Sequence, residues 1–134
     1  MAASASSAAP PPILTVFYNT KCPVCDAGIR DQKRRLHDLL VSGVVVFEDI
    51  NLRPDALYQF GAQLEDIRKK LHAIDANGQC LVGADVAIAM WRLTPGLKWL
   101  AAITGNPVTL PISRACYNVL AHFLYRWNKR KGHW

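Results

Sequence analysis

Two cysteines separated by two residues are the part of this sequence best suited to chemistry. Cys22 and Cys25 lie in the segment TVFYNTKCPVCDAG, between an apolar stretch and a stretch with helical spacing. A thiolate, rather than a thiol, attacks disulfides and binds metal ions, so either use requires a sulfur that ionises near neutral pH. The spacing fits a redox pair, half of a zinc site, or two buried thiols without a chemical role.

The position of Cys22 favours ionisation of its thiol. The first helix is predicted to begin here, and Pro23 suits its first turn, where a missing N–H costs nothing. The unpaired N–H groups and the positive end of the helix dipole stabilise a negative charge, and Lys21 adds a cation. We predict that Cys25, one turn further on, is the more buried of the two. Cys22 is then the nucleophile, and Cys25 resolves the mixed disulfide.

A zinc site needs four ligands, and the chain offers no second pair at knuckle spacing. The other cysteines and the histidines are isolated in sequence: Cys80, Cys116, His37, His72, His122 and His133. Free cysteine is among the most buried residue types, so Cys80 and Cys116 are predicted to be small core residues. A strand, a CxxC pair and a helix in succession favour the redox interpretation, with no metal or cofactor.

The dithiol is predicted to follow the C-terminal end of a buried strand. The run ILTVFY, residues 13–18, is rich in β-branched and aromatic residues, which suits a strand. Apolar residues then recur at helical spacing to about Leu40. The run VVVFEDI, residues 44–50, predicts a second strand after a short connection. A β-α-β unit of this kind has parallel strands.

The rest of the chain predicts a hairpin followed by helices. Asn77-Gly78 lies between the apolar runs 71–75 and 79–83, which is the strongest short hairpin signal. Helices are predicted over 54–60, 84–93, about 95–103 and 112–131. The fold class is therefore α/β and thioredoxin-like, with a mixed four-stranded sheet (parallel β-α-β plus antiparallel hairpin), packed helices and a helical C-terminal extension. Five aromatic residues at helical spacings are predicted to lie in the core: Trp91, Trp99, Tyr117, Phe123 and Trp127.

The length of 134 residues suits a single domain, which we place at residues 13–128. Residues 1–12, rich in Ala, Ser and Pro without charge, predict a disordered tail, and residues 129–134 predict a basic C-terminal tail.

Charged residues and prolines interrupt the most apolar region, so we expect no membrane-spanning helix. Four cysteines without a paired framework favour a reducing compartment, and we expect the cytoplasm.

Positive charge is concentrated in the last third of the chain. Up to Asp85 there are nine Lys and Arg against ten acidic residues, and after it there are seven Lys and Arg with no acidic residue. Four of these cations could make a weak contact with an anionic surface: Arg126, Lys129, Arg130 and Lys131. They are too few to predict specific nucleic-acid binding. The alternative function is therefore a non-catalytic binding module that docks through this basic third.

Several motifs, in order, resemble the DCC family of predicted thiol-disulfide oxidoreductases, also described as a domain of unknown function. They are VFYNTKCPVCDAGI, LHAIDANGQCLVGADVAIAMWRLTPGLKWLA and the late LPISRACYNVLAHFLYR. The resemblance runs from about Ile13 to Arg126, and it implies a thioredoxin-like fold with Cys22 and Cys25 as the redox-active pair. We therefore expect a protein-disulfide reductase or related oxidoreductase. Its partners are a disulfide-bearing protein or small molecule and a reductant that recycles the dithiol.

The chain departs from the family pattern just ahead of the dithiol. The family usually has Tyr-Asp-Gly there, whereas this chain has Tyr18, Asn19 and Thr20. Asn keeps a hydrogen-bonding side chain but cannot act as a base. The loss of a negative charge should make the nearby thiolate easier to form. The predicted supporting residues around the two cysteines are Tyr18, Asn19, Lys21 and Pro23.

Overall fold

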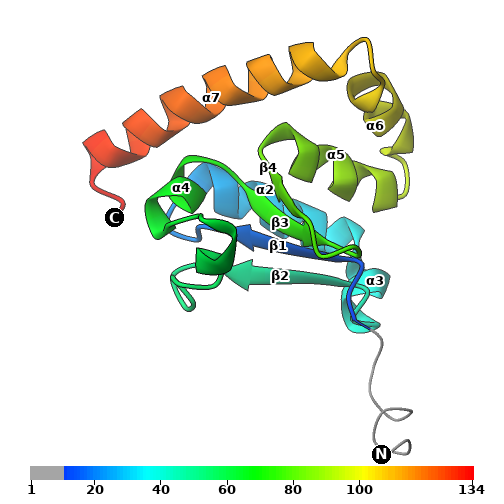
Figure 1. The fold of residues 1–134 in the computed structure, drawn as a ribbon, viewed down its shortest axis with the longest axis horizontal. Helices are drawn as coiled ribbons and strands as arrows, with labels where there is room; N and C mark the ends of the chain where they lie inside the picture. Colours follow the sequence, from blue (N-terminus) through cyan, green and yellow to red (C-terminus); the bar gives the residue numbers. More distant parts are fainter. Residues whose placement is uncertain (1–10) are drawn as a thin grey trace, which may run out of the picture.

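The computed structural model describes residues 11–134, so most of the predicted N-terminal tail lies outside the described residues. A four-stranded sheet in the order β2-β1-β3-β4 forms the centre (Figure 1). Its strands are β1 (Leu14–Tyr18), β2 (Val45–Asp49), β3 (His72–Asp75) and β4 (Cys80–Val82). The helices are α2 (Pro23–Arg35), α3 (His37–Val41), η1 (Tyr58–Phe60), α4 (Leu64–Lys69), α5 (Ala84–Leu93), α6 (Lys98–Gly105) and α7 (Leu110–Lys131).

The predicted β-α-β unit is confirmed, because β1 and β2 pair in parallel. The two faces of β1 are both covered. Leu14 and Val16 pack with Ile29 of α2 and with Met90 of α5, whereas Phe17 packs on the opposite side with Ile50 and other apolar residues. A strand buried on both faces reads as a continuous apolar run, which is the pattern of ILTVFY.

The first helix is shorter than its apolar spacing predicts. It ends at Arg35, and α3 begins at His37 after a break at Leu36, whose backbone leaves the helical region with φ −101° and ψ 19°. Leu36 is fully buried. The break therefore keeps an apolar side chain in the core while the chain changes direction toward β2.

The hairpin prediction is also confirmed. β3 and β4 are antiparallel, and β3 pairs antiparallel with β1. Gly78 has a φ of +78°, which is a left-handed conformation that glycine adopts without strain. The Asp75 carboxylate accepts hydrogen bonds from the backbone N–H groups of Asn77 and Gln79, both at 2.9 Å, which fixes the turn.

The connection between β2 and β3 differs from the prediction. Only Tyr58–Phe60 form a helical turn in the segment predicted as a short helix, and α4 (Leu64–Lys69) was not predicted. Its signal is the Gln63–Asp66 pair at the helix start: the Asp66 carboxylate accepts from the backbone N–H of Gln63 at 2.9 Å, and the Asp66 N–H donates to the Gln63 carbonyl oxygen at 3.0 Å. The buried Ile67 anchors α4 on the Phe17 side of the sheet.

The C-terminal helix α7 extends past the sheet and contacts α4, α5 and α6 (Figure 1). Its outer face is apolar and exposed, with Phe123 65% and Leu120 70% exposed. Trp99 of α6 and Trp127 are exposed too, so the prediction that these aromatic residues lie in the core is wrong for Trp99, Phe123 and Trp127. Helical spacing identifies a common face but does not say whether another element covers it.

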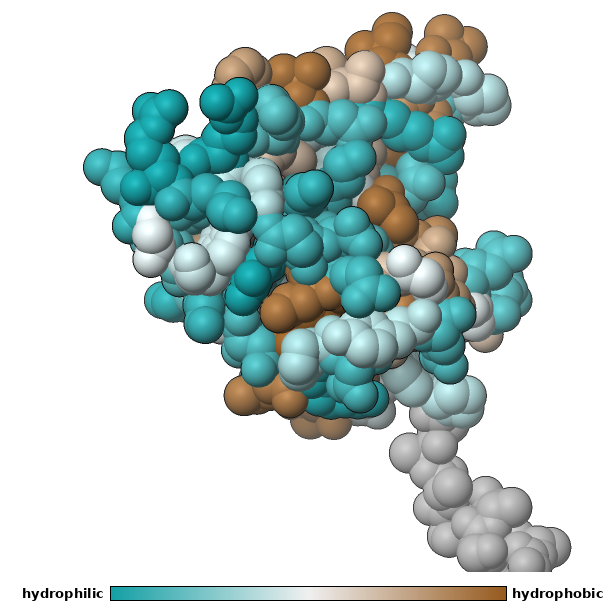
Figure 2. Space-filling view, turned by 60° about the vertical axis from the view of Figure 1, so that its left-hand side comes forward, coloured by the Kyte–Doolittle hydropathy of each residue, from teal (hydrophilic) through white to brown (hydrophobic). Residues whose placement is uncertain are grey.

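Hydrophobic residues are visible along the upper edge of the molecule in Figure 2, at the height at which α6 and α7 lie in Figure 1. Cys116 is on α7 and is exposed, which contradicts its predicted place in the core.

Within residues 11–134, none of the helices is both long enough and apolar enough to span a bilayer. The division between a domain at 13–128 and a basic tail at 129–134 stays a prediction.

Candidate functional site

A hydrogen-bonded loop connects β1 to the dithiol. Asn19 follows β1 directly, and its Oδ1 accepts from the backbone N–H of Lys21 at 3.0 Å and from Asn51 Nδ2 at 2.8 Å. The Cys22 N–H donates to the Asn19 carbonyl oxygen at 3.2 Å. Thr20 Oγ1 donates to Asp49 at the end of β2, at 2.8 Å. The ends of two neighbouring parallel strands thus hold the loop that presents Cys22.

Cys22 is the N-cap residue of α2, as its predicted place at the helix start requires. Its Sγ accepts hydrogen bonds from the Cys25 backbone N–H and from Asn128 Nδ2, each at 3.2 Å. A hydrogen bond from the Cys25 thiol is the largest of the effects that lower the Cys22 pKa, from 9.0 to about 6, and these two N–H donors assist it. Burial opposes ionisation but is outweighed. A pKa of about 6 makes Cys22 a thiolate at neutral pH.

Cys25 has the opposite electrostatics. Its hydrogen bond to Cys22 raises the Cys25 pKa above its ordinary value, and burial and the Cys22 charge raise it further. Two sulfurs in contact ionise in sequence, because the first thiolate disfavours the second. The pair therefore consists of one thiolate and one thiol that holds its proton.

The order of burial within the pair is the reverse of the prediction. Cys22 has no exposed surface, whereas Cys25 is only partly buried. The reason is α7, since Asn128 lies directly on the Cys22 sulfur and is itself 1% exposed. His133, just past the end of α7, donates from Nδ1 to Asn128 Oδ1 at 2.6 Å and so fixes the orientation of the amide.

The predicted supporting residues divide into those near the sulfurs and those elsewhere. Pro23 occupies the first turn of α2, and Asn19 organises the loop before Cys22. Tyr18 is part of the core beneath α2, and its hydroxyl accepts from Lys33 Nζ at 3.1 Å. Lys21 is exposed to solvent. Of the four residues, Asn19 and Pro23 therefore have structural links to the dithiol loop.

Sequence reasoning missed Asn128 as a neighbour of Cys22. The two residues are 106 positions apart, and Asn128 lies in a segment that reads as a charged helix end. A weak signal exists in the helical spacing. Tyr117, Ala121, Leu124 and Asn128 recur at intervals of three or four, and all four face the same pocket.

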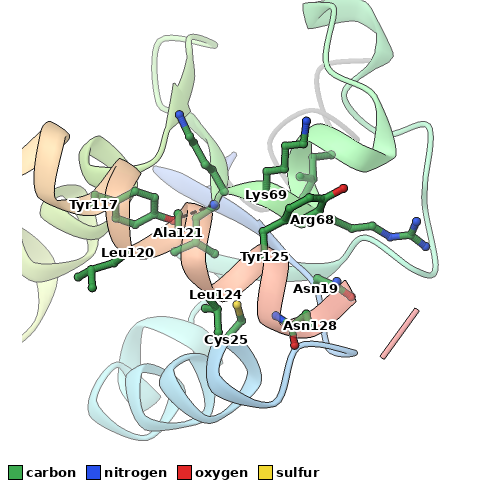
Figure 3. Close-up of a pocket in the computed structure, with 13 residues that line it drawn as sticks. Asn19, Cys25, Arg68, Lys69, Tyr117, Leu120, Ala121, Leu124, Tyr125 and Asn128 are labelled. Carbon is green, nitrogen blue, oxygen red and sulfur yellow. Dashed lines mark hydrogen bonds between the residues drawn. The ribbon is translucent and has the colours of Figure 1, made fainter. Parts of the chain in front are cut away.

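A pocket of about 200 Å³ lies beside the dithiol between α4 and α7 (Figure 3). Cys25, Asn19 and Asn128 line one part of it, and Arg68 and Lys69 of α4 line another. Figure 3 shows the Cys25 sulfur close to Leu124, at the α7 side of this pocket. The partly buried sulfur is therefore the one that faces the cavity.

The other side chains that could bind a metal ion are dispersed over the described part of the chain. Within residues 11–134, no three His, Cys, Asp or Glu side chains come together in a group that could hold a metal ion. The four cysteines, all in this part of the chain, are free. The dithiol site is thus built from two sulfurs, backbone N–H groups and amide side chains.

Comparison with known proteins gives one result. No curated protein and no solved structure matches the chain. A family model described as DCC1-like thiol-disulfide oxidoreductase matches residues 16–130, which include Cys22, Cys25 and Asn128. This confirms the resemblance found in the sequence, and the chain belongs to the DCC1-like thiol-disulfide oxidoreductase family.

Proposed function

We propose that this protein exchanges disulfides through its Cys-Pro-Val-Cys dithiol, with Cys22 as the nucleophile and Cys25 as the resolving residue. The observation that supports this most is the environment of the Cys22 sulfur. It caps a helix and accepts N–H hydrogen bonds from Cys25 and Asn128 at 3.2 Å. Such an environment stabilises a thiolate, which is the form that attacks disulfides.

In the first step, the Cys22 thiolate attacks one sulfur of a substrate disulfide. A bond forms between Cys22 and that sulfur, the substrate S–S bond breaks, and the other substrate sulfur leaves as a thiolate. The leaving thiolate takes up a proton. The Cys22 thiolate is then no longer available as the acceptor of the Cys25 hydrogen bond, so the largest cause of the raised Cys25 pKa is removed together with the Cys22 charge. Cys25 therefore loses its proton more easily once the mixed disulfide has formed.

In the second step, the Cys25 thiolate attacks the Cys22 sulfur and releases the second substrate thiol. The substrate gains two electrons, and the protein is left with a Cys22–Cys25 disulfide. A dithiol or thiol reductant must return two electrons before the next cycle. In this direction the protein acts as a protein-disulfide reductase, and its four free cysteines suit a reducing compartment such as the cytoplasm.

The first step requires a local movement of α7. Because Cys22 has no exposed surface, a substrate sulfur cannot reach it while Asn128 remains in place. We infer that the substrate displaces the Asn128 side chain when it approaches. Asn19 and Pro23 support the reaction by holding the loop and the helix start, and Lys21 and Tyr18 act only indirectly.

The test is a set of cysteine variants assayed for reduction of insulin and of a small model disulfide. Cys22→Ser should lose exchange, and Cys25→Ser should accumulate a mixed disulfide that mass spectrometry detects on Cys22. Cys80→Ser and Cys116→Ser are matched controls that should retain the rate. If Cys22→Ser and Cys25→Ser both react like the unmodified protein, the dithiol assignment is wrong.

We propose weak binding to an anionic lipid surface as a second, non-catalytic role. The specific observation is the exposed apolar face of α7, with Val119, Leu120 and Phe123, which lies on the same helix as the basic end. The cations at this end are Arg126, Lys129, Arg130 and Lys131, and all four are exposed. A helix with an apolar face and adjacent cations can bind at the membrane interface, with its apolar side chains among the acyl chains and its cations near the anionic headgroups.

Sedimentation with vesicles tests this second role. Binding should require phosphatidylserine, weaken with salt, and fall in Phe123→Ser and in Lys129→Gln/Arg130→Gln. Arg34→Gln/Arg35→Gln removes the same charge from α2 and should leave binding unchanged. Equal binding of all variants, or equal binding to phosphatidylcholine alone, would contradict a role for α7.

A further inference from the structure

We propose that the pocket between α4 and α7 binds a carboxylate of the disulfide substrate, so that the protein prefers acidic disulfides over neutral and basic ones. This inference rests on the exchange activity proposed above and specifies its substrate class. It comes from the pocket next to the partly buried sulfur, from the hydrogen-bonding groups that line it and from their charge.

The polar groups of the pocket include donors without acceptors. Asn19 is 2% exposed, and its Oδ1 is occupied by two hydrogen bonds. Its Nδ2 is buried and has no hydrogen-bond partner among residues 11–134. Arg68 Nε, on the α4 side of the same pocket, is likewise buried without a partner in the described chain. Glu65 Oε2, in the ion-pair partner of Arg68, is a buried acceptor that also lacks a hydrogen-bond partner in this part of the chain. Asn19 Nδ2, by contrast, is an unsatisfied donor in a residue that lines the pocket, and it needs an explanation.

A third polar group of the pocket is also available as a donor. The Tyr117 hydroxyl oxygen accepts from the backbone N–H of Leu71 at 3.0 Å. Burial raises the Tyr117 pKa to about 12, so its hydroxyl proton stays on at neutral pH. A ligand that carries acceptor oxygens would match these donors, whereas a ligand that carries ammonium groups would not.

The charge of the lining agrees with the donors. Arg68, Lys69 and Lys70 line the pocket, and among the described residues that line it none is acidic. Glu65 pairs with Arg68 at 3.3 Å from outside the lining and neutralises one charge in part. The remaining walls are largely apolar, with Leu124 and Leu120 from α7. An anionic oxygen group on a short apolar chain fits this combination.

The position of the pocket connects this recognition to the reaction. Cys25 and Asn128 line it together with Asn19 (Figure 3). A carboxylate held near Asn19 and Arg68 places the attached sulfur beside the dithiol, next to the Asn128 side chain that covers Cys22. Binding in the pocket is thus in a position to disturb the contact that shields the nucleophile.

Three aliphatic disulfides of similar size test the charge preference. They are 3,3′-dithiodipropionate, which is anionic, bis(2-hydroxyethyl) disulfide, which is neutral, and cystamine, which is cationic. The rate of each with the reduced protein is divided by its rate with 2-mercaptoethanol, which removes differences in intrinsic reactivity. We expect the normalised rates to fall in this order, with about a tenfold difference between the extremes, as one or two ion pairs of about 1 kcal/mol produce.

Charge-matched variants separate the pocket from the net charge of the protein. Arg68→Gln and Lys69→Gln should each reduce the preference for dithiodipropionate about threefold or more. Lys98→Gln removes the same charge from α6, which lies at the other end of the molecule from α4 (Figure 1), and should leave the preference unchanged. Equal normalised rates for the three disulfides, or an equal loss in all three variants, would overturn the proposal.

The carboxylate can belong to a polypeptide or to a small molecule, and peptide disulfides distinguish these two sources. Two peptides with the same disulfide carry either Glu or Lys beside the bridged cysteine. A preference for the Glu peptide that Lys69→Gln removes supports the pocket and points to a polypeptide substrate. If only dithiodipropionate is preferred and the two peptides react equally, the pocket is supported and the substrate is a small molecule. If neither the aliphatic disulfides nor the peptides show a preference for the acidic compound, the inference is overturned.

A binding measurement keeps the inference separate from the exchange activity. Cys22→Ser/Cys25→Ser cannot exchange, so dithiodipropionate and cystamine can be titrated into it by ¹⁵N NMR. We expect dithiodipropionate alone to shift the signals of Asn19 and its neighbours. If no disulfide reacts with the unmodified protein but this shift occurs, the proposed activity fails and the carboxylate site stands. If exchange occurs without such a shift, the carboxylate site fails and the activity stands.

Discussion

The segment β1–α2 and the helix α7 both contribute to the dithiol site, yet they are held in place very differently. In β1–α2, apolar residues are buried on both faces of the strand, and the helix follows within four residues. In α7, by contrast, several large apolar side chains stay exposed: Ile112, Val119, Leu120 and Phe123. Burial of apolar area stabilises the first segment far more than the second.

This difference separates two properties of the site. The strand and the helix start fix where Cys22 lies and supply the Cys25 N–H that its sulfur accepts. The less firmly packed α7 supplies Asn128, which both stabilises the thiolate and covers it. A stable element thus positions Cys22, the proposed nucleophile, and an element that can move with less loss of buried area covers it.

The same substitution in the two regions should have very different costs. Leu14→Ala in β1, where the side chain is 2% exposed, should destabilise the protein by about 2–5 kcal/mol. Leu120→Ala on α7, where it is 70% exposed, should change stability by about 0.5 kcal/mol or less. Urea unfolding measures both, and equal losses would show that α7 is buried against a partner in solution.

The stability of the reduced protein should rise with pH between about 6 and 9. Cys22 has a pKa of about 6 when folded and 9.0 as an ordinary thiol, so in this interval the unfolded state binds more protons. The contribution is lost below pH 6 and complete above pH 9. We expect a slope of about 1 kcal/mol per pH unit relative to Cys22→Ser, measured by urea unfolding. A parallel pH dependence in the two proteins would contradict the lowered pKa.

Asn128→Ala tests the contribution of α7 to the thiolate. It removes one N–H donor from the Cys22 sulfur, which should raise the Cys22 pKa. The free energy of unfolding at pH 8 should fall by about 1.5–3 kcal/mol, because a hydrogen bond to a charged group is lost. Thiolate absorbance at 240 nm measures the pKa without requiring access to the sulfur. Alkylation at a pH that ionises Cys22 fully should become faster, because the cover is gone. Asn118→Ala, an exposed amide on the same helix, is the matched control.

The smallest effect is expected for the ion pair between α7 and α5. Arg114 donates to both carboxylate oxygens of Asp85 at 3.0 Å, but both side chains are partly exposed to solvent. Arg114→Gln should lower the free energy of unfolding, measured with urea, by about 0.2–1 kcal/mol, and by less at high salt. A loss well above this range would mean that the ion pair, rather than apolar packing, holds α7 on the body.

Much of the fold could be read from local pattern. The run of β-branched residues, the Asn77-Gly78 turn and the proline after Cys22 each specify a local conformation, and each was placed correctly. The break at Leu36 and the helix α4 were missed because they depend on a buried side chain and on a capping pair outside any periodic apolar pattern. The exposure of Phe123 was not predicted, because helical periodicity shows which residues share a face but not whether another element covers that face.

The sequence by itself determined the dithiol, its place at a helix start and the family to which the chain belongs, because these follow from neighbouring residues and motifs in order. Only the tertiary structure decided that Cys22, rather than Cys25, is the fully buried sulfur. The physical reason is distance along the chain. The amide that reaches Cys22 is 106 residues away, and only the packing of α7 against α4 and α5 brings the two together.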